Sequence, residues 1–216
     1  MKSFPEALKL PLNLYFVLWL LVLAVLLITP QGDFLLWLNQ QSSPTLDLFF
    51  RLITYLGDGI IFGALLIIMI LFRFGYALIT LVAVMLQTFV IQGFKHWLFT
   101  GFPRPIRYFD ESVVLDKVEG VVVHSWNSFP SGHTATGFAV AFLLILFLKS
   151  KWWGIILLLL AILVGLSRIY LLQHFLIDTW FGSMVGILSA MVAWYLFASR
   201  KWFYKETWQR GLIKRN

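Results

Sequence analysis

Long apolar runs, separated by shorter polar segments, dominate the pattern of hydrophobic and polar positions along the chain. A helix needs about 20 apolar residues to cross the hydrocarbon core of a membrane. Solid apolar runs favour helices over a transmembrane barrel, whose strands alternate polar and apolar positions. The pattern therefore predicts an all-α, polytopic membrane protein with six transmembrane helices. The six uncharged runs cover residues 12–29, 59–72, 74–94, 134–148, 152–167 and 179–199.

The segments between these runs differ in length on the two sides of the predicted bundle. Two connections on one side are long, at about 31–58 and 95–132, whereas those on the other side shrink to Arg73 and residues 149–151. The apolar stretches within 31–58 predict a helical segment that lies in the membrane interface between spans one and two. No internal repeat divides the chain, so we predict a single membrane-embedded domain over residues 1–216.

Composition supports the membrane assignment. Hydrophobic residues make up 60% of the chain and charged residues only 12%, against about 25% charged residues in an average soluble domain. So little charge excludes an ordinary soluble enzyme and a disordered protein. The chain has no cysteine, which excludes disulfide bonds and thiolate metal sites.

The distribution of charge predicts the orientation in the membrane. Six spans place both termini on one side, and that side holds 11 of the 17 Lys and Arg residues but only two of the ten acids. Cytoplasmic segments of membrane proteins carry such an excess of basic residues. We therefore expect cytoplasmic termini and long connections on the outer face. The net charge of +7 is then a topology signal, and we predict no nucleic-acid partner.

Polar and ionisable residues near the ends of spans are the candidates for chemistry, because the bilayer makes them costly. Four groups of them fall on the predicted outer face, although their positions did not enter the topology count. This convergence predicts one functional site. The groups are Lys95, Arg104-Pro105, Pro130-Ser131-Gly132-His133, and Ser167-Arg168 with His174 and Asp178.

The basic members of these groups suit a phosphate ligand. Lys95, Arg104 and Arg168 supply three positive charges, and arginine binds phosphate oxygens in a bidentate manner. Ser131 and Gly132 stand where the fourth span begins, and the free N–H groups of a helix start bind anions. The sequence therefore predicts a phosphate site at the outer ends of spans three to six.

The two histidines suit phosphoryl transfer. His174 and Asp178 are four residues apart, so on a helix they share a face and can form a hydrogen bond. A carboxylate on one ring nitrogen leaves the other free to act as nucleophile or base. His133 is then available to protonate a leaving oxygen.

A metal site is the alternative that these residues leave open. His133, His174 and Asp178 form a set of two histidines and one carboxylate of the kind that binds metals. The three nearby cations repel a divalent metal, and the chain has no His-Glu-x-x-His element. We therefore expect no metal and no other cofactor.

These groups resemble the three-part signature of the type-2 phosphatidic-acid phosphatase family. Its members are integral-membrane lipid phosphatases, and vanadium haloperoxidases share the same signature. The signature region covers about residues 95–178. The second and third parts match in full, whereas the first has eight residues between lysine and Arg-Pro where the family commonly has six. The three parts are Lys95-x8-Arg104-Pro105, Pro130-Ser131-Gly132-His133 and Ser167-Arg168-x5-His174-x3-Asp178.

The resemblance implies a role for each matching residue. His174 would attack phosphorus and become phosphohistidine, Asp178 would orient it, and His133 would protonate the leaving group and then activate water. The phosphate would be held by Lys95, Arg104, Ser131, Gly132 and Arg168. His124 is a candidate contact to the substrate headgroup. The family needs no metal.

The expected function is hydrolysis of an outward-facing lipid phosphate or diphosphate. Phosphatidic acid, phosphatidylglycerol phosphate, undecaprenyl diphosphate and lipid A phosphate all fit, because each presents the same phosphate to the same cations. The alternatives are a lipid phosphotransferase and a non-enzymatic lipid-phosphate binder or transporter. We expect a bacterial plasma (inner) membrane location with a periplasmic or extracellular site. The oligomeric state is left open.

Overall fold

A computed structural model describes residues 4–213, and within that range the chain is helical, with no strand beyond an isolated bridge between Pro103 and Trp126. This confirms the all-α prediction. Each of the six apolar runs forms one long helix, with ends that differ from the expected ones by a few residues. These helices are α1 (Lys9–Ile28), α4 (Gly59–Phe72), α5 (Phe74–Gly93), α7 (Gly132–Leu148), α8 (Lys151–Tyr170) and α9 (Leu176–Ala198).

Within residues 4–213, four helical segments are long and apolar enough to cross a membrane: Glu6–Ile28, Phe74–Leu98, Lys151–Tyr170 and Leu176–Ala198. The bent pair Pro44–Gly57 and Gly59–Phe72 makes a fifth if it counts as one span. Helix α7, with 17 residues, is shorter. Apolar side chains such as Ile28, which is 80% exposed, cover the outside of the bundle, as expected of a membrane protein. The count of six spans stays a prediction.

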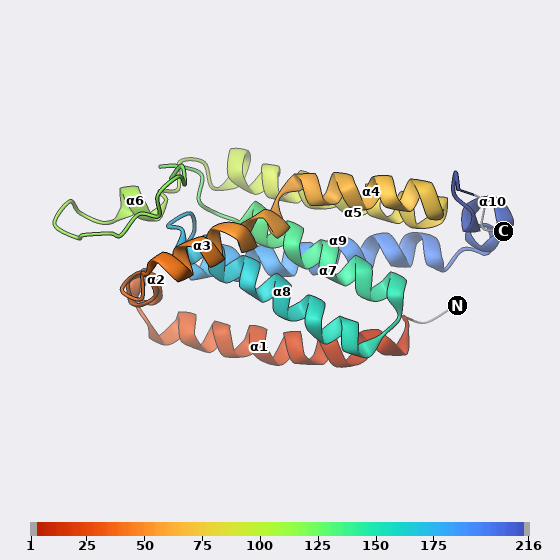
Figure 1. Cartoon of the computed structure of the whole chain (residues 1–216), viewed down its shortest axis with the longest axis horizontal. Helices are drawn as coiled ribbons and strands as arrows, with labels where there is room; N and C mark the ends of the chain where they lie inside the picture. The colour runs from red at the N-terminus through yellow and green to blue at the C-terminus, as the bar shows by residue number, and fades with distance from the viewer. Residues whose placement is uncertain (1–3, 214–216) are drawn as a thin grey trace.

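The long helices run along the long axis of the molecule (Figure 1). The short helices α2 (Asp33–Asn39), α3 (Pro44–Ile53) and α6 (Pro105–Tyr108) gather at one end, and α10 (Glu206–Gln209) lies at the other. The turn at Arg73 is at the α10 end, where the N–H of Phe74 donates to the carbonyl of Arg210. The long and short connections therefore lie at opposite ends. The basic residues Lys2, Lys214 and Arg215 of the topology count lie outside the described residues.

The segment 31–58 forms two helices and not one. Helix α2 ends at Asn39, and α3 begins at Pro44 after Ser43, whose side chain accepts a hydrogen bond from the N–H of Leu46. Proline at the first position and serine as the cap both favour a helix start there. A 3₁₀ turn, η2 (Thr54–Gly57), then leads into α4. The placement of this segment in the membrane interface stays a prediction.

Close packing of α7 against α9 positions the ends of both helices. A Cβ atom at Gly186 would lie 2.2 Å from the carbonyl oxygen of Ala135, and one at Gly182 would lie 2.6 Å from that of Ser131. Glycine is therefore required for the two backbones to approach. At the end of this contact the N–H of Ser131 donates to the carbonyl of Asp178 at 3.0 Å. This hydrogen bond joins the second part of the signature, which contains Ser131, to the third part, which contains Asp178.

Candidate active site

A cavity of about 420 Å³ opens among the ends of these helices and the loop before α7. All three predicted phosphate-binding cations, Lys95, Arg104 and Arg168, line it together with His133 and His174. None of the cavity-lining residues carries a carboxylate. The remaining lining residues are Arg51, Thr54, Tyr55, Gly120, Val121, Val122, His124, Gly132, Leu171 and Gln173.

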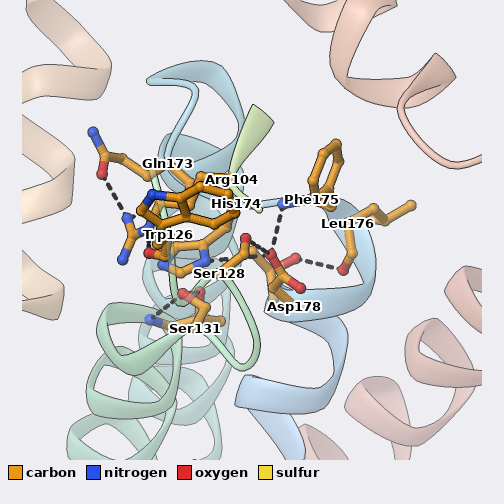
Figure 2. A network of polar contacts seen from close by, with 11 residues as sticks. Arg104, Trp126, Ser128, Ser131, Gln173, His174, Phe175, Leu176 and Asp178 are labelled. Carbon is orange, nitrogen blue, oxygen red and sulfur yellow. Dashed lines mark hydrogen bonds and ion pairs between the residues drawn. The ribbon is translucent and has the colours of Figure 1, made fainter. Parts of the chain in front are cut away.

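His174 and Asp178 are in contact behind the cavity wall. The Nδ1 atom of His174 lies 3.3 Å from Oδ2 of Asp178, and both side chains are almost fully buried. The same oxygen accepts hydrogen bonds from the Ser128 hydroxyl at 2.5 Å and from the backbone N–H of Phe175 at 2.9 Å. Figure 2 shows these groups converging on Asp178. The orientation of His174 is thus set by its neighbours.

The local fold that creates this contact differs from the expected one. His174 does not lie on a helix: it stands in the turn between α8 and α9, where its N–H donates to the carbonyl of Arg168. Asp178 is in the first turn of α9 and accepts from the N–H of the capping residue Phe175. A carboxylate at this position stabilises a helix start. The four-residue spacing therefore brings His174 and Asp178 together because Asp178 caps the start of α9, and not because both residues lie on one helix.

Burial lowers the pKa of His174 well below its ordinary value, and Arg104, Arg168 and Lys95 lower it further. The imidazole is therefore neutral near pH 7. With Asp178 accepting a hydrogen bond from Nδ1, the free lone pair of the neutral ring is on Nε2. Because His174 lines the cavity, this lone pair is the candidate nucleophile.

Arg104 is held by backbone and side-chain acceptors. Its Nε donates to the carbonyl of Trp126 at 2.9 Å, and its Nη1 donates to the side-chain oxygen of Gln173 at 2.8 Å, as Figure 2 shows. Gln173 in turn donates to the carbonyl of Val122 at 2.9 Å. Arginine held in this way presents its remaining N–H groups in a fixed direction.

Arg168, in the last turn of α8, has a different environment. Its Nη1 donates to the hydroxyl of Thr54 at 2.7 Å. Its Nε is buried and has no hydrogen-bond partner within residues 4–213. An orphaned buried donor at the wall of a cavity suits an anionic ligand, because a ligand oxygen would satisfy it.

Lys95 reaches the same cavity in spite of the longer spacing to Arg104. It lies in a π-helical turn, η3 (Phe94–Leu98), which extends α5 and ends where the N–H of Phe99 donates to the carbonyl of Phe94. A π-turn holds one more residue than an α-turn. Gly101 then turns the chain with a φ of +76°. The two residues beyond the family's usual six between lysine and Arg-Pro therefore lie in the connection from η3 to Arg104.

His133 opens α7 and faces a carboxylate that the sequence analysis did not single out. Its Nε2 lies 3.9 Å from Oδ2 of Asp58. The other oxygen of Asp58 accepts from the N–H of Ile60 and caps α4. Gly57 packs on the backbone here, because a Cβ atom would lie 2.6 Å from the carbonyl oxygen of His133. The α3–α4 connection thereby supports His133.

The sequence model of the PAP2 superfamily matches residues 76–202, which is more than half of the chain. The chain belongs to the PAP2 superfamily. This confirms the resemblance drawn from the signature. Membership of this superfamily supports a membrane lipid phosphatase as the broad class of activity.

Two crystal structures are similar to this chain. LpxE of Aquifex aeolicus has a TM-score of 0.67 and 30% sequence identity, over 76% of this chain and 94% of that one. The first transmembrane PAP2-type phosphatidylglycerolphosphate phosphatase from Bacillus subtilis has a TM-score of 0.60 and 24% identity, over 89% of this chain and 98% of that one. No curated protein matches the chain.

The structure separates the PAP2 signature residues into those at the cavity surface and those behind it. Ser131 is fully buried, does not line the cavity, and pairs its hydroxyl with that of Thr134 at 2.8 Å. It caps α7 and presents Gly132, which does line the cavity. His124 lines the cavity from the loop before α7 and is exposed. No three His, Asp or Glu side chains within residues 4–213 lie close enough together to hold a metal ion.

Several polar residues of the site escaped the sequence analysis. Ser128 contacts Asp178, Gln173 contacts Arg104, and Thr54 contacts Arg168. They are neutral residues in loops or helix ends, and nothing in the local pattern distinguishes them from surface positions. Proximity to the signature could have drawn attention to two of them, since Ser128 lies two residues before Pro130 and Gln173 directly precedes His174.

Proposed function

We propose that this protein is a membrane phosphatase that hydrolyses an outward-facing lipid phosphate or diphosphate through a phosphohistidine intermediate. One observation carries the proposal: three cations line the same cavity as His174, whose Nδ1 lies 3.3 Å from a buried carboxylate oxygen of Asp178. A neutral imidazole with a free Nε2 among cations is a nucleophile matched to an electron-rich phosphate ester.

In the first step, Nε2 of His174 attacks phosphorus and the bond from that phosphorus to the leaving oxygen breaks. The leaving oxygen is the alcohol oxygen of a lipid monophosphate or the bridging oxygen of a lipid diphosphate. The proton on Nδ1 stays between His174 and Asp178, which stabilises the positive charge of the phosphorylated ring. His133 enters this step as the imidazolium and gives its proton to the departing oxygen. The lipid leaves as an alcohol, or as a monophosphate when the substrate is a diphosphate.

In the second step, His133 takes a proton from water, and the resulting hydroxide attacks the phosphohistidine. The P–N bond breaks, inorganic phosphate leaves, and His174 returns to its neutral form. Lys95, Arg104 and Arg168 stabilise the charge on the transferring phosphoryl group in both steps. We propose that these cations supply the electrostatic stabilisation and that the reaction needs no metal.

We further propose six membrane spans, cytoplasmic termini and a site on the periplasmic or extracellular face of a bacterial plasma membrane. The basic residues at the α10 end support this orientation. A lipid keeps its chains in the bilayer while its headgroup reaches the cavity. Tyr55 lines the cavity and is exposed, and Leu52 and Trp97, which are close in sequence to the lining residues Arg51 and Lys95, are exposed as well. These apolar side chains suit contact with the lipid chains.

Phosphate release from purified protein in detergent tests the proposal. We expect much higher kcat/KM on long-chain lipid phosphates than on glycerol phosphate in the same detergent, because binding energy from the chains helps to align the phosphate. Activity should survive excess EDTA, and His174→Ala should abolish it. Hydrolysis in ¹⁸O-labelled water should place one labelled oxygen in the released phosphate. Equal efficiency on both substrate classes would contradict the lipid assignment.

A further inference from the structure

The cavity contains a fourth cation that the proposed mechanism does not use. Arg51, near the end of α3, lines the cavity together with Lys95, Arg104 and Arg168. Resting on the proposed function, we infer that the substrate carries a second phosphate beside the scissile one and that Arg51 binds this second phosphate.

The helical spacing places Arg51 next to the phosphate site. Thr54 follows Arg51 by three residues, and its hydroxyl accepts the 2.7 Å hydrogen bond from Nη1 of Arg168. Residues three apart in a helical stretch are neighbours, with Cβ atoms about 5–6 Å apart. Arg51 therefore stands within about one helical turn of the residue that touches Arg168. A phosphate linked directly to the scissile one would lie between Arg51 and Arg168.

Within residues 4–213, no carboxylate forms a salt bridge with Arg51. Its Nη1 donates to the backbone carbonyl of Glu119 at 3.3 Å, and not to the carboxylate. The same Nη1 atom lies close to Gly120, because a Cβ atom added to this glycine would be 3.5 Å from it. The remaining N–H groups of Arg51 are available to a ligand.

The charges of the whole cavity agree with a ligand that carries more than one phosphate. Four cations and no carboxylate line it. A single phosphate group carries about −1.5 to −2 charges near pH 7, which leaves about two of the four positive charges uncompensated. The volume of about 420 Å³ lies within the range of ligand pockets, about 300–1,000 Å³. A diphosphate headgroup matches both the charge and the space.

The same observations disfavour a basic headgroup. The outer loop carries Asp110, Glu111, Asp116 and Glu119, yet none of them lines the cavity. Asp116 instead exchanges two backbone hydrogen bonds with the side chain of Asn39. An amine on the headgroup would therefore meet four cations and no carboxylate at the cavity wall.

The decisive experiment compares two lipids that differ only in the second phosphate: a polyprenyl diphosphate and the polyprenyl monophosphate of the same chain length. Wild type, Arg51→Gln and Arg51→Lys are assayed in one detergent. Hydrogen bonds to charged groups contribute enough that Arg51→Gln should lower kcat/KM for the diphosphate by about 10- to 100-fold. This loss should exceed the loss on the monophosphate by at least about tenfold, and Arg51→Lys should restore part of it.

Arg107→Gln is the matched control, because Arg107 comes from the same outer region but lies over the Trp126 ring, outside the cavity. It removes the same charge and should not change the ratio of the two lipids. Equal losses on both lipids in Arg51→Gln, or no loss on either, would overturn the inference.

A binding measurement keeps this inference separate from the proposed function. Calorimetry with inorganic phosphate and the non-hydrolysable imidodiphosphate needs no turnover. Wild type should bind imidodiphosphate more tightly than phosphate, and Arg51→Gln should remove most of that preference. A wild-type protein that hydrolyses neither lipid yet shows this preference would contradict the proposed function and support the second phosphate site. The same affinity for both anions would overturn the site.

Discussion

At the scale of single residues, one oxygen of Asp178 connects three segments of the chain. It contacts the ring of His174, the hydroxyl of Ser128 and the N–H of Phe175. Because the last two contacts hold the carboxylate in place, the carboxylate in turn holds the imidazole in one orientation and one tautomer. The candidate nucleophile therefore depends on a side chain that does not itself line the cavity.

Replacing Asp178 with Asn keeps the shape but removes the charge and changes the hydrogen-bonding pattern at Nδ1. We expect kcat to fall by about 10²–10⁴-fold, because the ring loses its orienting partner and the charge that stabilises the phosphorylated form. Ser128→Ala is the comparison, since it removes a contact to Asp178 and leaves the carboxylate. Its loss should be smaller. An Asp178→Asn protein with more than about a tenth of wild-type kcat would contradict the role.

The lowered pKa of His174 predicts the acid limb of the pH profile. A histidine with an ordinary pKa of 6.5 loses its free lone pair as the pH falls through that value. Because burial and the nearby cations Arg104, Arg168 and Lys95 lower the pKa of His174, it stays neutral to a lower pH. The midpoint of the acid limb of kcat/KM should therefore lie below 6.5. Phosphorus NMR of the lipid gives the correction for ionisation of the substrate, and a corrected midpoint at or above 6.5 would contradict this.

At the scale of helices, the site depends on how closely α7 and α9 approach. Small residues in the first half of α7 face Gly182 and Gly186 of α9, so the backbones meet without intervening side chains. This contact joins Ser131 at the start of α7 to Asp178 in the first turn of α9. The packing of the two helices and the alignment of the signature are therefore coupled.

Gly186→Ala tests this coupling. Its Cβ would lie 2.2 Å from the carbonyl oxygen of Ala135, and such overpacking typically destabilises a protein by about 1–3 kcal/mol. The matched control is Gly63→Ala in α4, where nothing lies within 4 Å of the new Cβ and alanine should stabilise the helix by about 0.5–1 kcal/mol. Thermal unfolding in detergent should show a lower midpoint for Gly186→Ala alone. Equal midpoints for the two variants would be inconsistent with the close contact.

At the scale of the whole molecule, the helix ends that line the cavity, those of α3, α7 and α8, lie at the opposite end of the bundle from α10 and the basic segment 200–210 (Figure 1). The C-terminal segment is bound to the turn between α4 and α5, because the N–H groups of Leu212 and Ile213 donate to carbonyls of α4 and the Arg73 guanidinium donates to Gln209. This arrangement keeps the basic residues of that end together, as expected for a cytoplasmic face.

Chemical labelling of single cysteines tests the orientation, since the chain has none of its own. Ser112→Cys is in the exposed outer loop and Thr207→Cys is exposed on α10. An impermeant maleimide added to intact cells should label Ser112→Cys, and should label Thr207→Cys only after lysis. The reverse pattern would place the cavity in the cytoplasm and change the pool of lipids available to it.

The residues of the site illustrate how far the sequence leads. The apolar runs predict the helices correctly, because in a bilayer every backbone polar group must be satisfied within its own segment. The alternation of spans places Lys95, Arg104, His133 and His174 at one end, and the structure brings them to one cavity. This step follows from the topology alone and needs no knowledge of side-chain packing.

Tertiary structure decided what the topology does not specify. Thr54, Ser128 and Gln173 orient the charged groups because helix packing places their hydroxyl and amide groups within hydrogen-bond distance. Arg51 joins the cavity because the break after α2 lets α3 pack along α8, where the Tyr170 hydroxyl donates to Asp47 at 2.5 Å. Such contacts depend on distances between segments far apart in the chain. Local hydrophobic patterns determine which segments become helices, whereas the fit of side chains between helices determines which polar groups meet.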